Sequence, residues 1–105
     1  MSDRLVLTIL SAKGLVFEGE VDECYVPTNV GPVGILRGHT PYIASIKKIG
    51  ILKFASRSVK SFYVIKQGAV EVKGERLLVI TTEAIKANSL QDCEKMIEDF
   101  EKEEH

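Results

Sequence analysis

The feature that most constrains the fold of this chain is a series of short apolar runs between residue 5 and about residue 82. Each run is broken by Gly, Pro, Asn or Ser, and β-branched residues recur in most of them. The runs follow one another at roughly 8–12 residues, which is typical of all-β sandwiches and barrels. Long helical patterns do not alternate with these runs, as they would in an α/β fold. The pattern favours two packed, mostly antiparallel sheets.

The individual runs give the expected strands. In chain order they cover residues 5–10, 15–17, 21–26, 42–46, 49–54, 59–65, 69–73 and 77–82. Segment 27–34 is dense in turn-forming residues, and Gly74 with Glu75 suits a two-residue hairpin turn. We therefore expect residues 1–87 to form one β-sandwich domain.

The character of the sequence changes after residue 87. Asn88 and Ser89 are good N-cap residues, and Ser89 opens an S-x-x-[DE] capping box with Asp92. Apolar residues then recur at three- and four-residue steps, namely Leu90, Cys93, Met96, Ile97 and Phe100. This spacing predicts one amphipathic α-helix within residues 88–105. Its end is acidic and lacks a Gly or Pro stop, so we expect it to fray, to be capped by a partner, or to be a shortened element.

Composition excludes several classes of function. The formal net charge is −1, so the basic excess of a nucleic-acid-binding protein is missing. No apolar run reaches the roughly 20 residues that a membrane helix needs, and the first four residues read as neither a signal nor a transit peptide. Any membrane association is therefore expected through partner proteins. Cys24 and Cys93 stand apart, and we interpret them as reduced, structural thiols.

The sequence offers little catalytic chemistry. The two histidines, His39 and His105, stand far apart, and His39 has no Cys or second His near it. Phosphate-binding loops of the G-x-x-x-x-G-K-[ST] and G-x-G-x-x-G types are missing. We therefore expect no catalytic residues, no metal and no cofactor. From the residues alone, the chain is interpreted as a protein-interaction module.

Four passages carry a more specific resemblance. The segments 7–12 and 16–21 read LTILSA and VFEGEV, and segment 31–41 reads GPVGILRGHTP. Segment 68–72 reads GAVEV, and segment 79–85 reads VITTEAI. In this order they resemble the ATP synthase epsilon subunits, where G-x-x-G-I-L-P-G-H-x-P is the most specific segment. The resemblance spans nearly the whole chain.

The resemblance implies a ten-stranded, two-sheet β-sandwich followed here by a single C-terminal helix. It implies a non-catalytic rotor subunit that links the gamma subunit to the ring of c subunits and couples ion translocation to ATP synthesis. The alpha/beta head is a further expected partner, through the C-terminal helix. The expected location is the cytoplasmic face of the bacterial plasma membrane, reached only through partners.

Residue-by-residue matching then assigns candidate contacts. Ser11, His39 and Ala44 correspond to family positions near gamma, and the turn Gly31, Pro32 and Val33 corresponds to the loop that faces the c-ring. Three residues depart from the family pattern. Arg37 replaces a usual Pro, Pro32 stands where some members carry an acid, and Gln67 replaces a frequent Gly.

The start of the predicted helix departs from the family's nucleotide-binding motif. Some members bind ATP through I/L-D-x-x-R-A, whereas this chain reads LQDCEK over residues 90–95. Glu94 stands where an Arg would meet phosphate, and like charges repel there. We therefore predict weak or no ATP binding and reduced inhibition by the C-terminal part.

Two alternatives remain open at this point. An unrelated β module that binds a ligand such as carbohydrate would need exposed aromatic residues, yet the chain has no Trp. A small hydrolase using His39 would need a nucleophile, and none is placed near it. Association with gamma would distinguish the rotor subunit from both.

Overall fold

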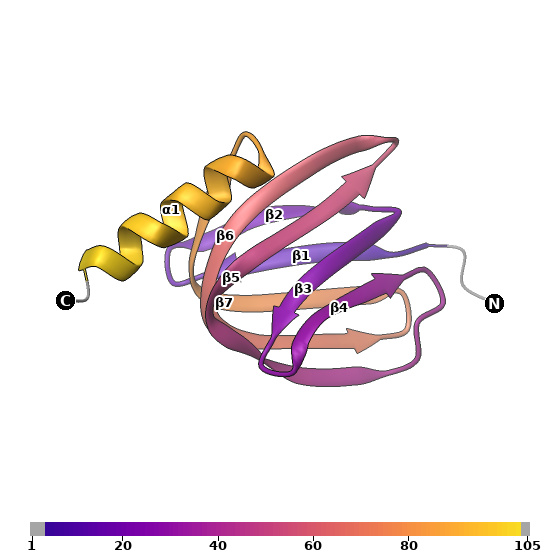
Figure 1. Ribbon diagram of the computed structural model, residues 1–105. Coiled ribbons are helices and arrows are strands. Elements are labelled where there is room, and N and C mark those ends of the chain that lie inside the picture. Colours follow the sequence, from indigo (N-terminus) through magenta and orange to yellow (C-terminus); the bar gives the residue numbers. More distant parts are fainter. Residues whose placement is uncertain (1–3, 104–105) are drawn as a thin grey trace.

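A computed structural model describes residues 4–103, so His105 lies outside the described part of the chain. Within these residues, seven strands form one strongly curled sheet, and a single helix packs against one end of it (Figure 1). The elements are β1 (Val6–Ser11), β2 (Gly14–Glu20), β3 (Glu23–Thr28), β4 (Gly31–Leu36), β5 (Tyr42–Ser56), β6 (Val59–Lys73), β7 (Arg76–Ala87) and α1 (Leu90–Glu103).

The sheet has the order β2-β1-β7-β6-β5-β3-β4. All neighbouring pairs are antiparallel except β1 with β7, which run parallel. Because the sheet curls, its two halves lie face to face and enclose the main core, as in a sandwich (Figure 1). The largest fully buried side chains come from almost every strand and include Leu7, Ile35, Leu52, Ile65 and Leu77.

The expectation of ten strands in two sheets is wrong in its count and connectivity. The runs 42–46 and 49–54, expected as separate strands, are one continuous strand, β5. The runs 59–65 and 69–73 likewise form β6, and the run that starts at Leu77 continues to Ala87 in β7. Each long strand bends between the two layers, so the layers are parts of one sheet.

The bend in these three strands has local causes, and we call this line across the sheet the crease. In β5 the pairing shifts by one residue between Ile46 and Ile49, which is the geometry of a β-bulge at Lys47 and Lys48. In β6, Gly68 passes so close to β7 that a Cβ atom there would overlap the carbonyl oxygen of Ile80. Only glycine fits this close approach.

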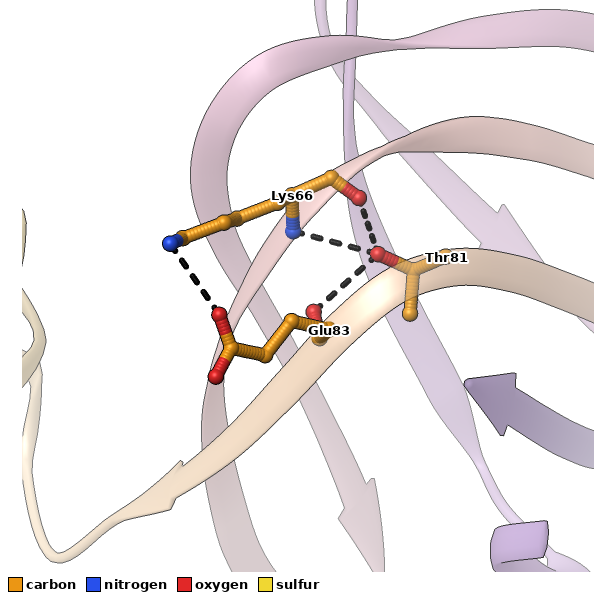
Figure 2. Close-up of polar contacts among 3 residues, drawn as sticks. All are labelled: Lys66, Thr81 and Glu83. Carbon is orange, nitrogen blue, oxygen red and sulfur yellow. Dashed lines mark hydrogen bonds and ion pairs between the residues drawn. The ribbon is translucent and has the colours of Figure 1, made fainter. Parts of the chain in front are cut away.

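A buried hydroxyl secures the crease on the β7 side, as Figure 2 shows. Thr81 Oγ1 accepts a hydrogen bond from the Lys66 backbone N–H at 3.1 Å. The carbonyl oxygens of Lys66 and of Glu83, the latter 3.1 Å away, are acceptors for its single proton. Thr81 thus satisfies backbone groups where the ladder between β6 and β7 is interrupted.

The hairpin turns follow the sequence signals. Lys73 pairs with Arg76 across Gly74 and Glu75, and Gly74 has φ +61°, so the predicted two-residue turn is confirmed. The β5–β6 turn instead places Arg57 and Ser58 at φ 52° and 69°. Such a turn matches the twist of the flanking strands.

Helix α1 begins as predicted. Ser89 Oγ accepts a hydrogen bond from the backbone N–H of Asp92 at 3.1 Å, which confirms Ser89 as the N-cap. Cys93 is fully buried, and Met96, Ile97 and Phe100 are half-buried against a second, smaller core. Leu90, predicted on the same buried face, is 44% exposed, so the buried face of the helix begins at Cys93.

Replacing Gly68 with Ala tests the crease. We expect Gly68→Ala to lower the free energy of unfolding by about 3 kcal/mol, because the new methyl group must displace the β7 backbone. Urea denaturation followed by circular dichroism measures the change. Gln67→Ala, at the exposed neighbouring position, is the control and should change stability by less than about 0.5 kcal/mol. Equal free energies of unfolding for Gly68→Ala and Gln67→Ala would contradict the close approach of Gly68 to strand β7.

Candidate partner-binding surfaces

The convex side of strands β5, β6 and β7 carries an exposed apolar patch. Ile43 is 74% exposed and Ile80 is 49% exposed, although both are large aliphatic residues in regular strands. They line a shallow depression of about 240 Å3 together with Ala69, Glu71 and Leu78. We call these five residues the outer apolar face. An apolar cluster of this kind on a small domain is typical of a protein-binding surface.

The pairing of the strands assembles this face. Ala69 pairs with Ile80 in the ladder between β6 and β7, and Ile43 pairs with Glu71 in the ladder between β5 and β6. Leu10 of β1 pairs with Ile80 and extends the apolar surface by one strand. Side chains of paired residues stand on the same side of a sheet, so these residues lie together.

Sequence reasoning missed Ile43 and Ile80 as surface residues, but the sequence carries a signal for them. A strand with one face in water alternates apolar and polar residues. The runs 42–46 (YIASI) and 77–80 (LLVI) are instead apolar at neighbouring positions. Since only one side of each strand meets the core, the other side must meet a partner or water.

The residues predicted near gamma lie around the outer apolar face without meeting one another. Ser11 ends β1 directly after Leu10, and its Oγ accepts the backbone N–H of Lys13 at 3.2 Å in the β1–β2 turn. Ala44 follows Ile43 in β5, but its own side chain is half-buried against the main core. Three strand pairings, through β7 and β6, separate β1 from β5.

His39 lies in the loop that enters β5. Its Nδ1 lies 2.7 Å from the carbonyl oxygen of Thr40, and its ring stands edge-on to Tyr42 with centroids 5.8 Å apart. Its backbone N–H donates to the carbonyl oxygen of Leu36 at 3.1 Å. These contacts give His39 a role in shaping the loop, and they bring no nucleophilic side chain to it.

The prediction that Gly31, Pro32 and Val33 form a turn is wrong in position. These residues begin strand β4, where Gly31 pairs with Thr28 and Val33 pairs with Val26. The turn itself is Asn29 and Val30. It is fixed by the Thr28 hydroxyl, which donates to the Gly31 carbonyl oxygen at 2.6 Å and accepts the Val30 N–H at 3.3 Å.

The pairing of β4 explains why sequence reasoning mistook it for a loop. Pro32 lies on an edge strand, where its missing N–H breaks no ladder. Pro27, opposite it in β3, coincides with the break in the ladder between β3 and β5. Segment 27–34 contains two prolines, two glycines and one asparagine, which are typical turn residues. Most of these residues nevertheless lie in the paired strands β3 and β4.

A groove of about 910 Å3 runs between this turn, the crease and helix α1. From the strands, its lining includes the basic residues Lys47 and Lys48 and the apolar residues Pro32, Ile49 and Ile51. The helix contributes Ile97, Phe100, Glu101 and Glu103. The lining of the groove therefore combines charges of both signs with apolar side chains.

Burial is the largest cause of the raised pKa values of Cys24, Cys93 and Tyr63. Burial raises the pKa of the Cys24 thiol in the main core. Burial also raises the pKa of Cys93, and the nearby carboxylates of Asp92 and Glu94 add to the effect. Thiols with raised pKa values are protonated and unreactive at neutral pH, which fits structural cysteines. Burial raises the pKa of Tyr63 in the same way.

Residues 4–103 contain no group of three or more His, Cys, Asp or Glu side chains arranged to hold a metal ion. Over the same residues, no helix has the length and apolar character needed to cross a membrane.

Comparison with known proteins agrees with this picture. Residues 4–87 match the family model described as the ATP synthase delta/epsilon chain, beta-sandwich domain. An ATP synthase epsilon chain from Aquifex aeolicus is 33% identical over 93 residues, which cover 89% of this chain and 69% of the relative. One from Rickettsia bellii (strain OSU 85-389) is 32% identical over 97 residues, covering 90% of this chain and 89% of the relative.

Solved structures share the fold. A chain of the Euglena gracilis mitochondrial ATP synthase superposes with a TM-score of 0.75 at 24% identity, over 91% of this chain and 62% of that one. A chain of the Tetrahymena thermophila central stalk and c-ring assembly gives a TM-score of 0.68 at 10% identity, over 93% and 90%. An unrelated ligand-binding module is therefore not favoured. The chain belongs to the ATP synthase epsilon-chain family.

Proposed function

We propose that this subunit links the gamma subunit to the c-ring and grips gamma with its outer apolar face. The observation that carries this proposal is the exposure of Ile43 and Ile80 in regular, paired strands. Exposed aliphatic side chains in such positions gain free energy when a partner covers them, by about 25 cal/mol for each Å2 of apolar surface.

The neighbourhood of the outer apolar face supports gamma as the partner. Ser11 follows Leu10 at its β1 side, Ala44 follows Ile43 at its β5 side, and the His39 loop leads into β5. These are the positions that the family resemblance assigns to the gamma interface. Ala44 itself faces the core, so in this account its neighbour Ile43 makes the contact. An interface that holds torque should bury more than about 1,000 Å2 in total.

The β3–β4 turn is the proposed contact with the c-ring. Val30 is 86% exposed at its tip, and Gly31, Pro32 and Val33 continue from it into the edge strand β4. Pro32 stands where some family members carry an acid, so this contact is proposed to be apolar rather than ionic. Val30 and Pro32 supply that apolar surface.

The proposed location is the cytoplasmic face of the bacterial plasma membrane, within the soluble part of the ATP synthase. Association with the membrane then comes through the c-ring. The alpha/beta head is a further proposed partner through helix α1. Because the first turns of α1 carry Asp92 and Glu94, we propose that nucleotide binding is weak or missing there and that inhibition by this helix is reduced.

Replacing both exposed isoleucines tests the gamma interface. We expect the double variant Ile43→Lys, Ile80→Lys to lose co-purification with gamma, because two ammonium groups would be desolvated in an apolar contact. We expect affinity to fall by at least about 100-fold, measured by surface plasmon resonance with gamma immobilised.

Val59→Lys is the matched control. Val59 is 66% exposed in strand β6 beside the β5–β6 turn, away from the outer apolar face. The control should bind gamma with unchanged affinity, and both variants should unfold at the same urea concentration as the native chain. Equal binding by the double variant and the control would reject the outer apolar face as the gamma interface.

Nucleotide binding is tested separately. We expect isothermal titration of the chain with ATP and Mg²⁺ to give no saturable heat up to millimolar ATP, because Glu94 stands where the family motif has Arg. Glu94→Arg is an informative companion variant. A micromolar Kd for the native chain would contradict this part of the proposal.

A further inference from the structure

Helix α1 is held to the sheet by a small cluster of three buried residues and the half-buried hydrophobic residues packed against them. Its own hydrophobic cluster contains three buried residues, Val64 of β6, Ala87 of β7 and Cys93 of α1. The main core, in contrast, draws buried residues from β1 and β3 to β7 and from the loops beside β1 and β3. Local regions with few buried apolar contacts open more readily than the rest of a domain. The docking of α1 therefore depends strongly on any further contact near its C-terminal end.

Lys66 supplies such a contact from the crease. Its Nζ lies 3.9 Å from the centroid of the Phe100 ring, which is a close cation–π distance. The same Nζ lies 3.0 Å from Glu83 Oε1, as Figure 2 shows. The side chains of Lys66 and Glu83 are 31% and 43% exposed, so water only partly screens this arrangement.

Hydrogen bonds hold the backbone of Lys66 in place, and its side chain extends from there to the helix. Thr81 binds both the N–H and the carbonyl oxygen of Lys66 through one hydroxyl (Figure 2). Glu83 then orients the ammonium group from the neighbouring strand. The lysine is thus anchored at its backbone and at its tip, which lowers the entropy lost when it packs on Phe100.

We propose that Lys66 is a clamp that holds α1 on the sheet through Phe100 and sets how often the helix undocks. The consequence reaches the groove, because Ile97, Phe100 and Glu101 form one of its walls. Undocking of α1 dismantles that groove and uncovers Cys93, which is otherwise fully buried. The clamp therefore controls both a cavity and an apolar helix face.

The two native cysteines report this motion without added probes. Cys93 lies on the buried face of α1 and becomes reactive when the helix undocks, whereas Cys24 lies in the main core and reacts only when the whole domain opens. Pulsed alkylation of the full chain with iodoacetamide, followed by peptide mass spectrometry, gives the two rates independently. The ratio of the rates separates helix undocking from general instability.

We expect Lys66→Met to raise the alkylation rate of Cys93 about tenfold and to leave that of Cys24 unchanged, since Met keeps the apolar stem and removes the charge. Lys47→Met is the matched control, because Lys47 lines the same groove and is exposed. The control should leave both rates unchanged. A Cys93 rate in Lys66→Met equal to that of the native chain would overturn the clamp.

A double-variant cycle identifies Phe100 as the partner. Phe100→Leu keeps an apolar side chain but removes the aromatic face, so the Lys66→Met, Phe100→Leu variant should raise the Cys93 rate by less than the product of the single effects. In the native chain, the ε-methylene protons of Lys66 should resonate upfield because of the Phe100 ring current, and this shift should vanish in Phe100→Leu. Multiplicative effects, or an ordinary Lys66 resonance in the native chain, would overturn the proposal.

Discussion

The rest of the structure depends on the crease, where three long strands bend from one layer of the sheet into the other. Gly68 makes this possible because any side chain there would meet the backbone of β7 at Ile80. At the bend, the Thr81 hydroxyl also binds the backbone N–H and carbonyl oxygen of Lys66. A single sheet can thereby enclose a core like that of a sandwich, and the two layers share three continuous strands.

Continuous strands also explain how this small domain can transmit force through contacts with its partners. Forces applied to one layer pass to the other through covalent backbone and through the ladders of β5, β6 and β7. The outer apolar face lies on these same strands, and the groove opens where they bend. A rigid body with an exposed apolar face suits the proposed link between gamma and the c-ring. Through the clamp proposed for Lys66, a residue at the crease also controls how firmly helix α1 is held on the sheet.

Much of the fold could be predicted from the sequence, and the failures have physical reasons. Short β-branched runs identified the strands, and Ser89 identified the start of α1, because these signals are local. Strand continuity across Lys47 and Gln67 could not be predicted, since a bulge and a close glycine contact depend on neighbouring strands. The run 27–34 was mistaken for a loop because Pro32 is harmless on an edge strand. For the site, the family resemblance led to Ser11 and Ala44, but only the alternation of β5 shows that Ile43 faces outward.

The most direct test of the account is a methyl NMR spectrum of the isoleucine-labelled subunit bound to unlabelled gamma. The account predicts that the δ1 methyl resonances of Ile43 and Ile80 shift on binding, because gamma covers the outer apolar face. The resonances of Ile49 and Ile51, in the groove on the other side of the crease, should remain in place. Shifts confined to Ile49 and Ile51, or no shift at Ile43 and Ile80 in a formed complex, would contradict the central claim.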